Sequence, residues 1–169
     1  MGDVELRPER PGDEDAIHAV TIAAFLEAPH TSHAEHFIVR ELRRAGALSV
    51  SLVAEIDGAI VGHVAISPVT IDGAAGGWFG LGSVSVAPGR QGAGIGSRLV
   101  REALAQLQTA RARGCVLVGE PSYYGRFGFR AAPALVLPGV PPRYFLAMGF
   151  NETLPRGVVA FHAAFEARA

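Results

Sequence analysis

Apolar and polar positions near the start of the chain predict a short strand followed by two helices. Residues 4–7 alternate apolar and charged side chains, which is the period of a strand. Asp13 is a residue type that caps helix N-termini, and we expect it to cap a helix that ends at Pro29. A second helix is expected from Ser32 to Gly46, because apolar residues recur there on one helical face.

The middle of the chain is rich in Val and Ile, and it predicts strands. The expected strands comprise residues 48–56, 60–69 and 79–86. Asp57 and Gly58 join the first two strands, and an Asp-Gly pair between apolar runs is a strong signal for a tight hairpin. The glycine-rich run 73–77 is expected to be a flexible turn before the third strand, which Pro88 ends.

Helical spacing returns in the second half of the chain. A long helix is expected over residues 95–113, and a short buried strand follows at 115–118. Prolines interrupt the rest, where a short helix precedes two final strands at 144–148 and 158–161. This order predicts an α+β fold: a sheet with helices on its faces. We expect one domain over residues 1–169.

Composition and charge narrow the classes of function. Of the 169 residues, 49% are hydrophobic and 18% are charged, which suits one packed core. A net charge of -1 supplies no long-range field for nucleic acid or an anionic membrane, so we expect neither as a main partner. The single cysteine, Cys115, excludes an internal disulfide and suits a reducing compartment. Because the start lacks an apolar leader and no apolar run is long, we expect a cytoplasmic monomer or small oligomer.

A glycine-rich turn between the third of these strands and the long helix carries the clearest chemistry. Residues 83–97 run SVSVAPGRQGAGIGS. Glycine lets a backbone approach a ligand closely, and the first N–H groups of a helix have no partner within the helix. A strand, a glycine loop and a helix in this order therefore form a ready phosphate site, with a plain tight turn as the alternative.

Spacing argues against two common phosphate-binding motifs. The dinucleotide fingerprint needs a glycine three residues after a Gly-x-Gly pair, and neither pair in this loop has one. The mononucleotide P-loop needs Gly-Lys-Ser or Gly-Lys-Thr, whereas Gly96 is followed by Ser97 and Arg98. Neither class of nucleotide site is therefore predicted.

The same loop resembles a family motif. Residues 91–96, QGAGIG, are similar to the Q/R-x-x-G-x-G/A motif of GNAT acetyltransferases, behind the usual apolar strand and proline. The resemblance extends across most of the chain. The segments PSYYGRFGF, PPRYFLAM and FHAAF resemble a bacterial branch of predicted N-acetyltransferases that has no agreed substrate. The resemblance implies a GNAT-like α+β fold, which is a mixed, mostly antiparallel twisted sheet of about six to seven strands with helices on both faces. It also implies acetyl-CoA as the cosubstrate.

This resemblance also implies which residues bind the cofactor. Backbone amides of the loop would hold the CoA pyrophosphate, and the strand before it would pair with the pantetheine arm. The N–H of Val84 would point at the thioester carbonyl as an oxyanion donor. The residues that match the family pattern are Val84, Ser85, Val86, Gln91, Gly92, Ala93, Gly94, Ile95, Gly96 and Ser97.

Amide formation from a thioester needs groups that move protons. An alkyl ammonium with a pKa of about 10.4 is less than ~0.1% neutral at pH 7, and the departing thiolate gains from protonation. Tyr124 stands four residues before Gly128, where the family often keeps a tyrosine that protonates this sulfur. Packing beside Phe127 and Phe129 is the alternative role. Tyr123 is the weaker candidate, because it is expected to face elsewhere on a helix.

The general base stays open among three candidates. Glu120 is the first choice, because the resemblance places the exit of its strand beside the acetyl end of the cofactor. A surface role before Pro121 is the alternative. Glu35 lies on the second predicted helix, which helps to wall the acceptor site in relatives. A chain of water molecules is the third candidate.

Histidines and late aromatic residues complete the candidate positions. His30, His33 and His36 are spaced by three, which allows metal ligation as one interpretation. A metal site needs further ligands and support, so we expect no metal, and favour an acceptor wall or a solvated helix face. Tyr144 and Phe145 look exposed, and they are expected to form part of the acceptor wall or a homodimer contact.

These observations predict an acyltransferase that moves an acetyl group from acetyl-CoA to a primary amine by direct attack in a ternary complex. The acceptor is expected to be a small-molecule or peptide amine. A non-catalytic acyl-CoA-binding sensor or interaction module on the same fold is the alternative. Transfer of a longer acyl chain by the same machinery is a third hypothesis.

Overall fold

The computed structural model of the protein describes residues 2–29, 31–151 and 153–168. In these ranges the strands are β1 (Glu5–Pro8), β2 (Val50–Ile56), β3 (Ala59–Ile71), β4 (Ala74–Val86), β5 (Gly114–Val118), β6 (Arg130–Ala131), β7 (Leu135–Val136), β8 (Phe145–Gly149) and β9 (Gly157–Ala160). The α-helices are α1 (Glu14–Phe25), α2 (Glu35–Arg44), α3 (Ile95–Thr109) and α4 (Pro121–Tyr124). Short 3-10 helices are η1 (Pro88–Arg90), η2 (Gly125–Phe127), η3 (Pro142–Tyr144) and η4 (Ala163–Glu166).

The strands form a mixed and mostly antiparallel sheet, as the sequence predicts. Its order is β1-β2-β3-β4-β5-β8-β6, and β9 joins the end of β3 and also pairs with β7. Along this order β4 and β5 are parallel and the other neighbours are antiparallel. The described sheet has nine strands, more than expected. The surplus comes from β6 and β7, which have two residues each and show no alternation that a local pattern could detect.

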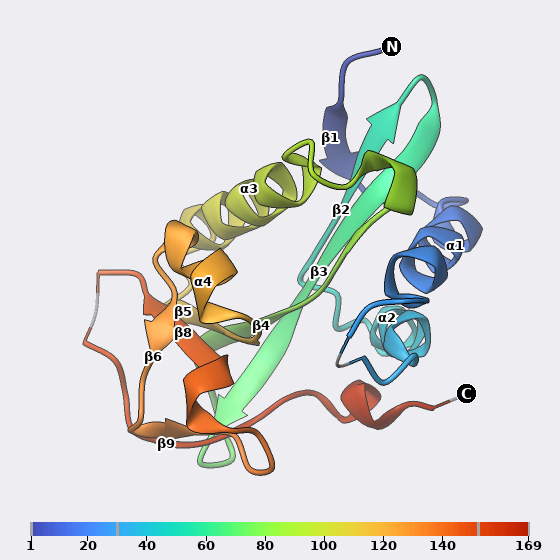
Figure 1. Ribbon diagram of the computed structural model, residues 1–169. Coiled ribbons are helices and arrows are strands. Elements are labelled where there is room, and N and C mark those ends of the chain that lie inside the picture. Colours follow the sequence, from blue (N-terminus) through green and yellow to red (C-terminus); the bar gives the residue numbers. More distant parts are fainter. Residues whose placement is uncertain (1, 30, 152, 169) are drawn as a thin grey trace.

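Helices cover both faces of the sheet, which confirms the predicted α+β architecture. In Figure 1, α3 lies on one side of β2 and β3, and α1 and α2 lie on the other side. Leu52 and Val64 pack in the cluster that contains the apolar stripe of α3. Their neighbours Val53 and Ala65 pack in another cluster, with Ile17 of α1. Because both faces are buried, these strands have nearly continuous apolar runs.

The helices follow the predicted order with shorter bounds. α1 begins directly after Asp13, but the Asp13 side chain makes no capping hydrogen bond. Its carboxylate instead accepts hydrogen bonds from Arg7 Nη1 at 2.7 Å and from the N–H of Arg10 at 2.7 Å. α2 starts at Glu35 rather than at Ser32, and α3 is shorter than predicted at its end. A tertiary ion pair, absent from any local pattern, decides what the Asp13 side chain binds.

The glycine-rich run 73–77 is not the flexible turn that the sequence predicts. β3 and β4 are 13 residues long each, and Asp72 and Gly73 form the turn between them with φ of 51° and 80°. Positive φ at both central positions is typical of the tight turn that matches the twist of a hairpin. Gly76 and Gly77 lie exposed in β4, between the pairs Thr70–Ala75 and Pro68–Phe79, where the register with β3 shifts.

β4 and β5 separate partway along their length, and this separation positions the candidate site. Their parallel pairing ends at Gly80 of β4, and no described strand pairs with that edge of β4 beyond this point. Ile66 of β3 pairs with Leu81. Val64, two residues before Ile66 on β3, pairs with Val84, which is three residues after Leu81 on β4. Between these two pairs, β4 therefore holds one extra residue. Such a bulge bends a strand, which directs the rest of β4 away from β5.

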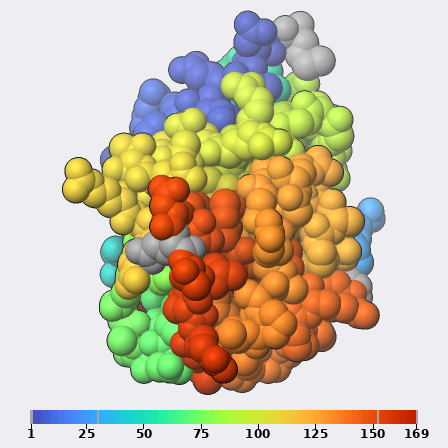
Figure 2. Space-filling view, turned by 90° about the vertical axis from the view of Figure 1, so that its left-hand side faces the viewer, coloured from blue at the N-terminus to red at the C-terminus, as the bar shows by residue number. Residues whose placement is uncertain are grey.

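The segments beside this opening come from distant parts of the chain. On the face shown in Figure 2, α3 crosses the molecule between the N-terminal segment and the segments that contain α4 and the last strands. The start of α3 and the segment around α4 lie side by side there. No helix within the described ranges is long and apolar enough to span a membrane.

Candidate active site

The glycine-rich turn leads from β4 through η1 into α3, as predicted. Gly92 and Gly94 have φ of 82° and 84°, which side chains other than glycine rarely adopt. A Cβ built on either glycine meets no atom within 4 Å, so the surface over the loop is open. The N–H of Arg98 donates to the Gly94 carbonyl at 3.1 Å, which leaves the N–H groups of residues 95–97 ahead of the helical ladder. This helix start is therefore suited to bind an anion.

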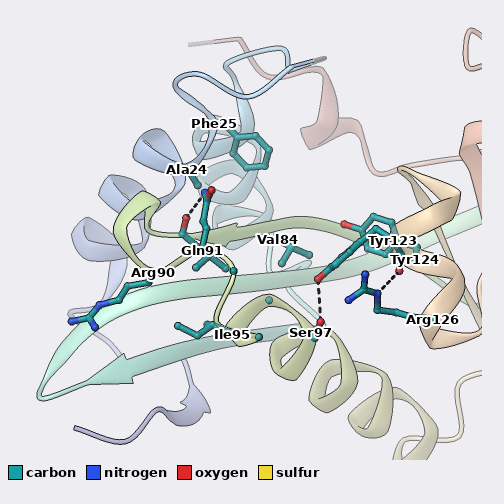
Figure 3. A pocket seen from close by; sticks show the side chains of 14 residues that line it. Ala24, Phe25, Val84, Arg90, Gln91, Ile95, Ser97, Tyr123, Tyr124 and Arg126 are labelled. Carbon is teal, nitrogen blue, oxygen red and sulfur yellow. Dashed lines mark hydrogen bonds between the residues drawn. The ribbon is translucent and has the colours of Figure 1, made fainter. Parts of the chain in front are cut away.

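A cavity of about 520 Å³ lies against this loop. Its walls are the end of α1, the outer half of β4, the start of α3, and α4 (Figure 3). Most of the predicted cofactor-binding residues line it, namely Val84, Val86, Gln91, Gly92, Gly94, Ile95, Gly96 and Ser97. The structure therefore brings the matched strand and the matched loop to one cavity.

Two of the predicted cofactor-binding residues do not line this cavity, and a third, Gln91, lines it and also bonds to β4. Ser85 is 1% exposed and lies between Val84 and Val86, so its side chain is on the opposite face of β4. Ala93 is exposed on the loop, outside the cavity lining. Gln91 Nε2 donates to the Val86 carbonyl at 3.1 Å, which ties the loop to the end of β4. The roles expected of these residues toward the cofactor stay predictions.

Tyr124 lies at the end of α4, on the wall of this cavity. Burial, together with the neighbouring Tyr123, raises the pKa of its hydroxyl to about 12. Tyr124 is therefore protonated at neutral pH, as a proton donor must be. Its ring centroid also lies 6.2 Å from those of Phe127 and Phe129, so the contacts of a packing tyrosine are present as well.

A glycine makes room for this ring. A Cβ built on Gly119 would lie 2.5 Å from Cε2 and 2.7 Å from Cδ2 of Tyr124. These distances are far below carbon–carbon contact, so any side chain at Gly119 would displace the ring. Gly119 therefore leaves the space that the Tyr124 ring occupies, and the sequence motifs do not single it out.

Tyr123 faces the same cavity, which corrects the expectation that it faces elsewhere. Its hydroxyl lies 3.4 Å from Ser97 Oγ, and Figure 3 shows the ring reaching toward α3. Arg126 lies over the Tyr123 ring, 4.4 Å from its centroid, and Arg126 Nε donates to the Tyr123 carbonyl at 3.0 Å. The rings of Tyr123 and Tyr124 meet edge to face, with centroids 4.9 Å apart. Because α4 is only one turn long, both neighbours reach the cavity.

Two arginines bring positive charge to this cavity. Arg90 of η1 and Arg126 of η2 both line it. Cationic side chains beside a glycine loop suit a ligand with phosphate groups. No motif predicts that these two arginines line the cavity. Arg90 directly precedes the matched loop, and this position could have indicated it as a candidate.

A second cavity, of about 660 Å³, lies on the other side of Tyr124. Both cavities have Phe25, Val84 and Tyr124 among their lining residues. The walls of the second are α2, the bulge of β4, the end of β5 and C-terminal segments. They are mostly apolar, with Glu35 and Arg168 as the charged side chains. The arrangement can hold two ligands that meet at Tyr124.

The two predicted acids have different surroundings. Glu35 lines the second cavity, and its Oε2 accepts hydrogen bonds from Thr31 Oγ1 at 2.6 Å and the Ser32 N–H at 3.3 Å. Its Oε1 is buried without a hydrogen-bond partner among the described residues. Glu120 is exposed and lines neither cavity, while its backbone carbonyl accepts from the N–H of Tyr124 at 3.0 Å. Which acid acts as the base stays a prediction.

The spacing of His30, His33 and His36 allows metal ligation as one interpretation. His30 lies outside the described residues. His33 is exposed, and His36 packs against His18 with ring centroids 4.7 Å apart. Within the described ranges, no group of three or more His, Cys, Asp or Glu side chains could hold a metal ion.

Phe145 is 2% exposed, which corrects its interpretation as an exposed aromatic. It begins β8 and pairs with Val118 of β5, so sheet formation buries it. Tyr144 is half-buried, and neither residue lines the two cavities. The aromatic wall of the second cavity comes instead from Phe161 and Phe165 near the end of the chain. The homodimer contact stays a prediction.

Comparison with known proteins agrees with this arrangement. A family model described as an acetyltransferase (GNAT) domain matches residues 5–132. The Escherichia coli K12 protein named Uncharacterized N-acetyltransferase YhbS is 38% identical over 120 residues, which are 70% of this chain and 72% of that protein.

Solved structures are similar over nearly the whole chain. A GNAT family acetyltransferase from Brucella melitensis, in complex with acetyl-CoA, has 50% identity and a TM-score of 0.89, covering 98% of this chain and 100% of that one. YhbS from Escherichia coli, in complex with CoA, has 31% identity and a TM-score of 0.88, covering 100% of this chain and 95% of that one. With the family model spanning most of its length, the protein belongs to the GNAT family of N-acetyltransferases.

Proposed function

We propose that the protein transfers an acetyl group from acetyl-CoA to a primary amine, by direct attack of the amine within a ternary complex. The observation that carries this proposal is the meeting of the two cavities at Tyr124 and Val84. Direct attack needs both substrates bound side by side, because the nitrogen must reach the thioester carbon while the cofactor is held. Adjoining cavities with shared walls meet that need.

Acetyl-CoA fits the first cavity by its chemistry. The open N–H groups at the start of α3, together with Arg90 and Arg126, suit the pyrophosphate. The outer edge of β4, which no described strand covers beyond Gly80, can pair with the amide groups of the pantetheine arm. The similar structures with bound acetyl-CoA and CoA support this assignment.

The proposed reaction assigns each electron pair and proton. The amine lone pair forms the C–N bond with the thioester carbonyl carbon, and the C=O π electrons move to oxygen, toward which the N–H of Val84 would donate. When the C=O reforms, the C–S bond breaks and its electron pair stays with sulfur. Tyr124 donates its proton to that sulfur. The nitrogen, positively charged after the attack, loses its second proton, which reprotonates Tyr124 through solvent. For each ammonium and thioester consumed, one amide, one thiol and one proton result.

Other parts of the proposal follow from the sequence. We place the activity in the cytoplasm, and the acceptor is a small-molecule or peptide amine. The base that neutralises the ammonium is Glu120, Glu35 or a water chain, and the surroundings of Glu35 are developed below. Both cavities are formed within one chain, so they do not require a homodimer and do not conflict with one.

Isothermal calorimetry with acetyl-CoA tests the proposal first. Wild type is compared with Gly94→Glu/Gly96→Glu, which puts two carboxylates where the pyrophosphate is proposed to lie. The matched control, Ala105→Glu/Thr109→Glu, adds the same charge at exposed positions of the same helix α3. We expect wild type and control to bind and the loop variant to lose binding.

An amine screen with free-thiol detection follows for the protein that binds. Thiol release that depends on an added amine supports acetyl transfer. Binding without turnover for every primary amine would favour the acyl-CoA-binding sensor instead. No binding by wild type at millimolar acetyl-CoA would mean that the glycine loop is wrongly assigned, and the proposed function would fail.

A further inference from the structure

The second cavity carries an inference about the acceptor, and it rests on the proposed function. We infer that the acceptor is a primary amine with one positive charge and an apolar body, and that Glu35 and Ser83 hold its ammonium group. This class excludes polyamines, which carry more than one positive charge, and amines whose body is polar. The inference draws on two buried polar atoms and on the side chains around them.

Two polar atoms at this cavity lack partners. Glu35 Oε1 and Ser83 Oγ are both buried without a hydrogen bond to any described residue, and both residues line the cavity. Burying a hydrogen-bond acceptor that has no donor costs free energy of folding, and the cost is greatest for a carboxylate oxygen. A primary ammonium carries three N–H donors and a positive charge, and so supplies what both oxygens lack.

The carboxylate of Glu35 is held in place from the other side. Its Oε2 accepts hydrogen bonds from Thr31 Oγ1 at 2.6 Å, from the Ser32 N–H at 3.3 Å and from Ser32 Oγ at 3.4 Å. These donors belong to the segment just before α2, so they restrain the rotation of the carboxylate. A ligand that binds Oε1 therefore meets a preorganised group.

The rest of the cavity favours an apolar body. Its apolar side chains include Ile38, Leu81, Leu137, Val140, Phe161 and Phe165. Such walls cannot solvate a second charge on the ligand. Arg168, the one cation among the described residues of the lining, would repel a second ammonium. Its Nη1 already donates to the carbonyls of Phe165 and Ala167.

The position of Glu35 also suits it to neutralise the amine. Glu35 and Tyr124 both line the second cavity. Tyr124 also lines the first cavity, where the thioester is proposed to lie. The ammonium N–H bond breaks, its electron pair stays on nitrogen as the attacking lone pair, and the proton passes to the carboxylate. The resulting carboxyl group returns that proton to solvent after the product leaves.

A series of linear amines tests the apolar body. We expect kcat/KM to rise about fourfold per added methylene from propylamine to hexylamine, as burial of each group predicts. We expect 1,5-diaminopentane, which ends in a second ammonium, to react at least ~100-fold less efficiently than hexylamine. A flat series, or a diamine as good as hexylamine, would overturn the inference.

Substitutions test the ammonium site. Glu35→Gln keeps the size and removes the charge, and we expect it to lower kcat/KM for hexylamine about 10- to 100-fold without changing acetyl-CoA binding. Ser83→Ala should lower it about 3- to 10-fold. Glu41→Gln on the same helix is the matched control, because Glu41 pairs with Arg44 at the surface and lies outside this cavity. Full activity of Glu35→Gln, with the loss in Glu120→Gln instead, would overturn the assignment.

Direct binding of hexylamine separates the two proposals. Calorimetry on the CoA-loaded protein should show hexylamine binding that Glu35→Gln loses and Glu41→Gln keeps. If wild type binds hexylamine but transfers no acetyl group to it, the proposed function fails and the amine site stands. If wild type acetylates other amines and neither binds nor prefers hexylamine, the proposed function stands and this inference fails.

Discussion

Replacing Gly119 by alanine is expected to displace the proposed acid, Tyr124. The added Cβ would lie 2.5 Å from Cε2 and 2.7 Å from Cδ2 of the Tyr124 ring. Carbon atoms in contact stay roughly 3.5–4 Å apart, so the ring must move by about 1 Å. The backbone of Gly119 lies outside the left-handed region, so alanine adds no dihedral strain of its own.

The magnitude follows from the size of that shift. A misplacement of about 1 Å at a reacting group can cost about 10²-fold in rate, and a general acid itself contributes about 10²-fold or more. We therefore expect Gly119→Ala to lower kcat about 10- to 100-fold. Acetyl-CoA binding should change much less than kcat, because Tyr124 is one of many lining residues of the first cavity and the glycine loop is not among the nearest contacts of the new methyl group.

Initial rates of thiol release at saturating substrates provide the assay. Gly125→Ala is the matched control, because it lies next to Tyr124 with φ of -59° and ψ of -27°, and a Cβ there meets nothing within 4 Å. If Gly119 acts through the Tyr124 hydroxyl, the double variant Gly119→Ala/Tyr124→Phe should be no slower than Tyr124→Phe alone. Wild-type turnover in Gly119→Ala, or a loss that adds in full to that of Tyr124→Phe, would refute the positioning argument.

Two further predictions concern Tyr124 and His63. Tyr124→Phe should lower kcat about 10²-fold with little change in acetyl-CoA affinity, and wild-type turnover in steady-state kinetics would end the acid assignment. His63 is fully buried, and burial lowers the pKa of its imidazole to about 4, against about 6.5 in an unfolded chain. Between these values the unfolded chain binds a proton that the folded chain does not, so the free energy of unfolding should fall by about 2 kcal/mol from pH 7 to pH 5. Urea unfolding at both pH values measures this fall, which His63→Gln should remove; the same fall in that variant would contradict the assignment.

Local patterns determined much of the fold, because helices and strands impose periods that short segments reveal. The apolar stripe of α3 and the Val- and Ile-rich runs of β2 and β3 predicted these elements near their observed bounds. The Asp57-Gly58 turn was equally local, and both residues have positive φ. The prediction of a flexible turn over residues 73–77 was wrong for a related reason, because glycine permits a turn but does not require one.

That the matched strand and the glycine loop lie together was also predictable from the chain alone. A strand, a glycine loop and a helix start are contiguous in sequence, so their motif carries the geometry that binds an anion. The resemblance to the GNAT family then named the ligand class, and the structure brings the matched strand and loop to one wall.

Tertiary structure alone decided how distant segments meet. The bulge of β4, the inward direction of Tyr123 and the burial of Phe145 all depend on partners in other elements of the chain. The second cavity is the clearest case, because α2, β4, β5 and the last residues together form its walls. Periodicity reports which face of a segment is buried but not which segment packs against it. The sequence therefore determined the elements and the glycine loop, while packing between remote segments decided the second cavity.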